Sequence, residues 1–204
     1  MNMTADRVAM VAGASMPWMR MPGQSWLGAA AMFIAMWAVM MIAMMTPSLV
    51  PTLWRNRHRL AIAAGYFFVW ILVGAAVYPI GVVVAFATMR WPALAHAVPT
   101  AGGVVILLAG FVQLTAWKAR QLQACRSPEC AKNPWRHGLR LGLRCTLCCS
   151  GLMSILLVIG VMNLVAMGVV TTAITAERLA PKPQIISRVI GVAAIVAGAV
   201  ISYA

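Results

Sequence analysis

Long runs of apolar residues, separated by short clusters of basic and turn-forming residues, make up most of the chain. Five of these runs approach the roughly 20 residues that a helix needs to cross a bilayer: residues 26–45, 61–89, 101–117, 145–172 and 185–203. The runs are too continuous for the alternating strands of a barrel, and lipid leaves no partner for an unpaired backbone group. The pattern therefore predicts an all-α fold, a polytopic transmembrane helix bundle with about five spanning helices.

Prolines lie close to the ends of several runs. Pro47 and Pro51 follow the first run and are expected to lie outside that helix, and Pro79 inside the second run predicts a kink or an early end. We expect a single transmembrane helical domain over residues 26–204. A methionine-rich N-terminal segment, residues 1–25, is expected to be external or interfacial.

Composition agrees with a membrane protein. Hydrophobic residues make up 63% of the 204 residues and charged residues only 9%, whereas charged residues make up about a quarter of an ordinary soluble domain. The net charge of +13 could indicate nucleic-acid binding in a soluble protein. Here the basic residues lie between apolar runs, where they meet anionic lipid. The lipid bilayer is the expected partner, and no nucleic acid is expected.

The distribution of basic residues predicts an orientation. Three arginines lie in residues 54–60 and seven Lys and Arg in residues 118–144, against six on the other expected side. Loops rich in Lys and Arg stay in the cytoplasm. We therefore expect a multi-pass protein of the bacterial inner (plasma) membrane, with its N-terminus outside and its C-terminus in the cytoplasm.

Few polar side chains interrupt the apolar runs. Gln113 and Asn163 lie within expected spans, where a hydrogen bond between helices is the usual role of an uncharged polar residue. Glu177 and Arg178 are neighbours near the end of a run. We expect them to form an ion pair at the membrane interface.

Three of the five cysteines fall within five residues: Cys145, Cys148 and Cys149. On a helix they share one face, because residues three and four apart are neighbours, and Met153 would extend that face with a thioether. The other two, Cys125 and Cys130, lie in the preceding basic segment, where cationic neighbours favour thiolates. Soft sulfur donors select Cu(I), and zinc is possible at a site dominated by thiolates.

Methionine recurs every four residues along the first run, at Met32, Met36, Met40 and Met44, with Met41 and Met45 beside them. Such a stripe is commonly a packing surface, because methionine is a flexible core filler. In the predicted topology the end of this helix and the cysteines both lie on the cytoplasmic side. Met41, Met44 and Met45 are therefore candidate ligands together with the cysteines.

The order of the motifs resembles a known family. These motifs are M-W-x-x-M-M-x-x-M-M-x-P at 36–47, A-G-F-V-Q-L at 109–114, C-R-S-P at 125–128 and C-x-x-C-C-x-x-L-M at 145–153. Over roughly residues 32–190 they resemble an uncharacterised bacterial family described as predicted metal-binding integral membrane proteins. The resemblance implies a helical membrane protein with a metal site at these Met and Cys positions.

Three classes of function fit these features. The first is a non-enzymatic protein that stores, delivers or passes Cu(I), with a metallochaperone or a membrane complex as possible partner. The second is a membrane thiol-disulfide oxidoreductase, with Cys148 or Cys149 as nucleophile and Cys145 or Cys125 as resolving partner. The third is a structural or assembly subunit with inert thiols. The gathering of soft ligands favours the first class and makes an enzyme the less favoured reading.

Overall fold

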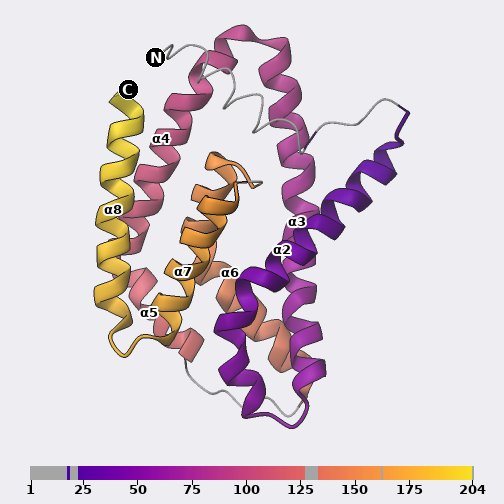
Figure 1. The fold of residues 1–204 in the computed structure, drawn as a ribbon, viewed down its shortest axis with the longest axis vertical. Helices are drawn as coiled ribbons and strands as arrows, with labels where there is room; N and C mark the ends of the chain where they lie inside the picture. Colours follow the sequence, from indigo (N-terminus) through magenta and orange to yellow (C-terminus); the bar gives the residue numbers. More distant parts are fainter. Residues whose placement is uncertain (1–17, 19–22, 127–132, 162, 204) are drawn as a thin grey trace.

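The computed structural model describes Trp18 and residues 23–126, 133–161 and 163–203 (Figure 1). Within these ranges the chain forms seven α-helices and no strand, which confirms the all-α prediction. The helices are α2 (Trp26–Trp54), α3 (Arg59–Arg90), α4 (Pro92–Leu114), α5 (Ala116–Arg126), α6 (Pro134–Ile159), α7 (Leu164–Leu179) and α8 (Pro183–Tyr203).

Four of the helices are long and apolar enough to cross a membrane, namely α2, α3, α6 and α8. The segments 100–114 and 116–123, from α4 and α5, form a fifth candidate span that is bent by 66° at Thr115. The expectation of about five spanning helices is therefore confirmed. Of the expected N-terminal segment, Trp18 is described, and its ring lies 5.0 Å from that of Phe33 on α2.

Helix α2 is longer than the sequence suggested. It continues through Pro47 and Pro51 to Trp54, so the expectation that these prolines lie beyond the helix was wrong. Proline removes a backbone donor, which leaves the carbonyl four residues earlier without its helical partner. Hydroxyls in the same stretch bond other carbonyls: Thr46 donates to that of Ile42 and Ser48 to that of Met45. Helix α3 likewise continues through Pro79.

The expected span over residues 145–172 is instead two helices. Helix α6 ends because Gly160 has a φ of 114°, a left-handed conformation that glycine adopts readily and other residues rarely do. Helix α7 then begins with Asn163 as its N-cap, which accepts a 3.0 Å hydrogen bond from the backbone N–H of Ala166. Asn163 is thus bonded within its own helix, and the expectation that it joins two helices was wrong.

The break between α6 and α7 reverses the direction of the chain. Helix α7 turns back and packs against α2, α6 and α8, so α8 runs in the opposite direction to α4. Trp26 at the start of α2 lies 6.0 Å from Phe86 near the end of α3. Gly191 on α8 lies beside Gly110 near the end of α4, and Gly198, further along α8, lies beside Gly103 at the middle of α4, so α8 runs back toward the start of α4. The start of α2 and the end of α8 are therefore at the same end of the bundle (Figure 1), which differs from the expected arrangement on opposite sides.

The opposite end of the bundle carries most of the positive charge. We call it the basic end; it comprises the α2–α3 turn, α5, the first half of α6 and the α7–α8 turn (Figure 1). Among the described residues, Arg90 is the one Lys or Arg that lies at the other end. The structure therefore places Arg178, Lys182 and Arg188 toward the basic end, whereas the expected topology placed them on the other side.

Helix α6 is held against α3 by direct backbone contact. A Cβ atom added to Gly138 would lie 2.2 Å from the carbonyl oxygen of Ile62, and one added to Gly65 would lie 2.7 Å from that of Trp135. Small residues allow this close approach between membrane helices. The contact fixes the position of the helix that carries three cysteines.

We predict that Gly138→Ala destabilises the protein by about 1–3 kcal/mol, the usual cost of overpacking. Gly151→Ala on the same helix is the control, because its Cβ would lie 3.6 Å from the nearest atom outside its own helix, an ordinary contact. The measurement is unfolding of the detergent-solubilised protein in increasing SDS, followed by tryptophan fluorescence. Equal stability of the two variants would contradict the close α3–α6 contact.

Candidate metal centre

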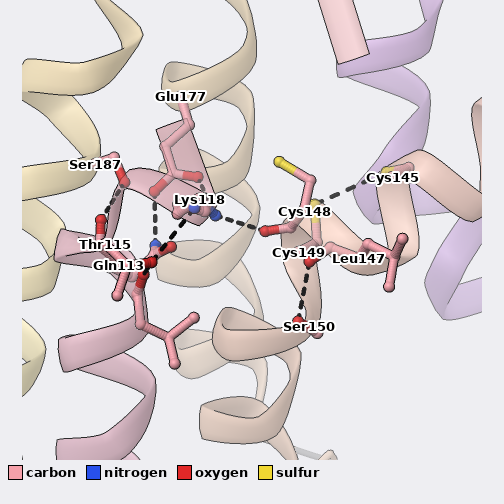
Figure 2. Close-up of polar contacts among 11 residues, drawn as sticks. Gln113, Thr115, Lys118, Cys145, Leu147, Cys148, Cys149, Ser150, Glu177 and Ser187 are labelled. Atoms are coloured by element: carbon pink, nitrogen blue, oxygen red, sulfur yellow. Dashed lines mark hydrogen bonds and ion pairs between the residues drawn. The ribbon is translucent and has the colours of Figure 1, made fainter. Parts of the chain in front are cut away.

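The three clustered cysteines lie on the face of α6 that points into the bundle. Cys145 is fully buried, and Cys148 and Cys149 are each 1% exposed. Cys145 Sγ and Cys149 Sγ are 3.8 Å apart, one helical turn from each other. Figure 2 shows these two thiols directed toward one another. The helical spacing has therefore placed two soft donors side by side in the core.

The structure brings a fourth cysteine to this group. Cys125, near the end of α5, is partly buried and lies next to Cys148. The interaction with Cys148, together with burial, raises the pKa of the Cys125 thiol. Cys148 in turn lies next to Cys149. Four free thiols thus form a series that runs from Cys125 through Cys148 and Cys149 to Cys145.

The sulfur of Cys145 accepts hydrogen bonds from two other side chains. The Tyr66 hydroxyl donates to Cys145 Sγ at 2.9 Å, and Arg178 Nη1 donates to the same sulfur at 3.3 Å. Arg178 Nη1 also donates to Ser48 Oγ on α2 at 3.0 Å. A cation and a hydroxyl directed at one sulfur stabilise negative charge on it.

The candidate methionines share the hydrophobic core with the cysteines. Met41 and Met45 are fully buried, Met44 is 2% exposed and Met153 is 7% exposed. Met32, by contrast, is 67% exposed, so the outer part of the stripe faces away from the core. The buried part remains a candidate for ligation. Cys130, the last candidate ligand, lies outside the described residues.

The sulfurs form a line rather than a closed coordination shell. In the described part of the chain, no group of three or more His, Cys, Asp or Glu side chains is arranged to hold a metal ion. The Cys145–Cys149 separation nonetheless suits two donors to one ion. With bonds of about 2.3 Å, two sulfurs on a tetrahedral ion lie about 3.8 Å apart. The pair would supply two ligands of such a shell, and the buried thioethers of Met41, Met44, Met45 and Met153 are the candidates for the others.

A buried ion pair lies next to the cysteines, and the sequence reasoning missed it. Lys118 Nζ is 2.9 Å from Glu177 Oε2, and the two side chains are 2% and 1% exposed. Gln113 Nε2 donates to Glu177 Oε1 at 2.7 Å, which confirms the expected hydrogen bond between helices. Lys118 Nζ also donates to the backbone carbonyl of Cys148 (Figure 2). The cluster therefore ties α4, α5 and α7 to the cysteine helix.

The expected interfacial pair of Glu177 with Arg178 was wrong. Glu177 reaches Lys118, whereas Arg178 reaches Cys145 and Ser48, and both side chains are buried. Consecutive residues on a helix point about 100° apart, so they contact different neighbours. One signal in the sequence was available: ionisable residues at the edge of apolar runs are costly and usually have a specific partner.

The fold and the site together define a helical protein with a buried cluster of thiols, and four or five of its helices are long and apolar enough to cross a membrane. The family model of PpoB2, described as copper chaperone, matches residues 34–201. Since the match covers most of the chain, the protein belongs to this copper chaperone family. The membership agrees with the metal-related family that the motifs resemble and with copper as the metal. No curated protein and no solved structure matches the chain.

We predict that breaking the buried ion pair on one side destabilises the protein strongly. Lys118→Met or Glu177→Met alone should cost about 3–5 kcal/mol, because each leaves a buried charge without its counter-charge. The double variant Lys118→Met with Glu177→Met should recover most of that loss. SDS unfolding followed by tryptophan fluorescence measures all three.

The matched control is Arg188→Met, which changes an exposed cation on α8 and should shift stability by no more than about 0.5 kcal/mol. A double variant as unstable as the sum of the two single variants would contradict a direct pairing of Lys118 with Glu177.

Proposed function

We propose that this protein binds Cu(I) inside the membrane between Cys145 and Cys149 and delivers it to an acceptor. The observation that carries the proposal is the buried pair of sulfurs 3.8 Å apart, with Arg178 and Tyr66 donating to one of them. Thiolates are the protein ligands that select soft Cu(I). Membership of a copper chaperone family supports the same cargo.

The chemistry of the surrounding groups favours a soft ion. Among the described residues, Glu177 supplies the carboxylate near the cysteines, and its two oxygens are bonded to Gln113 and Lys118. Hard cations such as Mg²⁺ and Ca²⁺ need free oxygen ligands. With that carboxylate engaged, sulfur is the donor that the site offers, and the buried Met41, Met44, Met45 and Met153 would add thioethers as weaker ligands.

The series of thiols favours delivery over storage. Cys125 is partly exposed, whereas Cys145 is fully buried, so the series joins the basic end of the bundle to its core. A Cu(I) ion can move between neighbouring sulfurs by exchanging one ligand at a time. Cys130, which follows Cys125 in the sequence, is a further candidate thiol. A metallochaperone or a membrane complex at the basic end is the proposed partner.

Cu(I) binding tests the site. We predict that Cys145→Ser with Cys149→Ser abolishes high-affinity Cu(I) binding, with a loss larger than the roughly 10–100-fold that removing a supporting residue costs. Serine keeps the approximate size of the side chain but lacks the soft donor. The measurement is competition with a Cu(I)-specific chelator on detergent-purified, reduced protein, followed by elemental analysis.

Cys125→Ser is the matched control. It should leave the stoichiometry unchanged, because it removes a thiol of the series but not of the proposed pair, and should slow loading instead. SDS unfolding checks that both proteins are folded. Unchanged Cu(I) affinity in the Cys145/Cys149 variant would overturn the site assignment.

The orientation follows from the position of the basic end. We propose that the protein lies in a bacterial inner membrane with the basic end in the cytoplasm, because Lys and Arg concentrate on the cytoplasmic side. Both the start of α2 and the end of α8 would then face outward. Alkaline phosphatase fused after Ala204 should be active, and fused within the α2–α3 turn after Arg57 it should be inactive. The reverse pattern would contradict this orientation.

A further inference from the structure

One face of α5 carries Cys125 toward the cysteine helix. Lys118, Leu122 and Cys125 are four and then three residues apart, so they share this face. Lys118 Nζ donates to the backbone carbonyl of Cys148 (Figure 2), and the Leu122 side chain is 1% exposed. Cys125 packs against the hydrophobic core that contains Cys148. Helices α5 and α6 therefore each contribute a cysteine to the surface at which they meet.

These two cysteines differ in their access from outside the bundle. Cys125 is partly exposed and lies next to Cys148, whose side chain is 1% exposed. Both are free thiols. Cysteines that respond to oxidants are commonly accessible and placed beside a second, resolving cysteine. A reagent at the basic end can therefore reach Cys125 first, and Cys148 is the neighbouring thiol that can react next.

Helix geometry limits which thiols can be joined. A disulfide has Cβ atoms about 3.5–4.5 Å apart, whereas residues three or four apart on a helix have Cβ atoms about 5–6 Å apart. Cys145 therefore does not meet this requirement with Cys148 or Cys149 while α6 stays helical. Cys148 and Cys149 are consecutive, so their side chains point about 100° apart. A bridge between α5 and α6 is free of these limits, because it joins two separate helices.

We propose that Cys125 and Cys148 form a reversible disulfide that closes the route to the Cys145–Cys149 pair. The bridge would consume the two thiols through which the ion is proposed to reach the pair, and it would leave the pair itself unchanged. The consequence for copper rests on the proposed function, whereas the bridge does not. In the proposed orientation the basic end faces the cytoplasm, where disulfides are usually transient and redox-sensing.

The oxidant is a low-molecular-weight disulfide, and the reaction is thiol–disulfide exchange. The sulfur of Cys125 attacks one sulfur of the oxidant, the S–S bond of the oxidant breaks, and the first thiol leaves with the proton of Cys125. Cys148 then attacks the Cys125 sulfur of this mixed disulfide, and the second thiol leaves with the proton of Cys148. The two cysteines lose two electrons in total, and the oxidant gains them as it becomes two thiols.

Thiol counting and peptide mapping test the bridge in the unchanged protein. The detergent-purified, reduced protein is treated with glutathione disulfide in alkaline buffer, because the interaction with Cys148 and burial raise the pKa of the Cys125 thiol and slow its attack at neutral pH. Free thiols, counted by alkylation after denaturation, should fall from five to three, since the bridge consumes two of the five cysteines. Mass spectrometry of the digested protein should find the peptides of Cys125 and Cys148 joined.

Two variants that retain two cysteines each compare a bridge between helices with one along a helix. The first retains Cys125 and Cys148. It carries Cys130→Ser, Cys145→Ser and Cys149→Ser, and it should lose both free thiols to one intramolecular disulfide. The matched control retains Cys145 and Cys149. It carries serine at the other three positions, and both of its thiols should remain free of an intramolecular bridge under the same conditions.

The rate of copper loading tests the consequence of the bridge. The oxidised protein, freed of glutathione by gel filtration, receives Cu(I) from a chelator complex. Loading should slow to the rate of the reduced Cys125→Ser, Cys148→Ser variant, because both proteins lack the same two thiols. The final stoichiometry should equal that of the reduced, unchanged protein, since the Cys145–Cys149 pair is intact. Treatment with a dithiol reductant should restore the original rate.

The outcomes are distinguishable. A count that stays at five free thiols, or a bridge mapped between Cys125 and Cys130, would overturn the proposal. Equal loading rates before and after formation of a mapped Cys125–Cys148 bridge would also overturn it. These results leave the copper pair intact. Unchanged Cu(I) affinity after Cys145→Ser with Cys149→Ser would instead overturn the proposed function, and a mapped bridge would stand without it.

Discussion

A charged side chain inside an apolar bundle needs a partner, and this constraint organises the centre of the molecule. Glu177 and Arg178 are consecutive on α7, yet Glu177 pairs with Lys118 of α5 and Arg178 bonds Ser48 of α2 and Cys145 of α6. Removing such groups from water costs several kcal/mol each unless they are paired. The contacts therefore hold α7 inside the bundle between three other helices, although at 16 residues it is short for a span.

The sequence predicted the fold class because length and hydropathy suffice for that purpose. An apolar run of spanning length has to be helical in lipid, whatever its neighbours are. Hydropathy did not indicate the break at Gly160. Glycine barely alters the hydropathy of an apolar run, although the φ of 114° at Gly160 ends the helix. Asn163, three residues later, is a good N-cap residue. Gly160 followed by Asn163 therefore indicates that one helix ends and another begins. Pro47 and Pro51 were expected to lie beyond the helix because proline often ends one, but the residues around Pro47 are buried in the bundle, namely Met44, Met45, Ser48 and Leu49, and the helix continues.

The part of the candidate site that lies on one helix was predictable from the sequence. Cys145 and Cys149 are one turn apart on any helix, so their proximity needs no tertiary information. The approach of Cys125 depends on the 66° bend between α4 and α5, and no pattern in the sequence fixes that angle. Lys118 looked like one of many basic loop residues. Only the packing of α5 against α6 and α7 shows that its charge belongs to the core.

The ion pair and the thiols are two parts of one arrangement. Lys118 reaches both Glu177 and the backbone carbonyl of Cys148, so the pair positions the cysteine helix as well as neutralising itself. With Glu177 neutralised by Lys118, Arg178 remains to face the sulfur of Cys145. Because Glu177 pairs with Lys118 rather than with its neighbour in the sequence, it is not the group that Arg178 contacts, and Arg178 donates to the thiol of Cys145 and to Ser48.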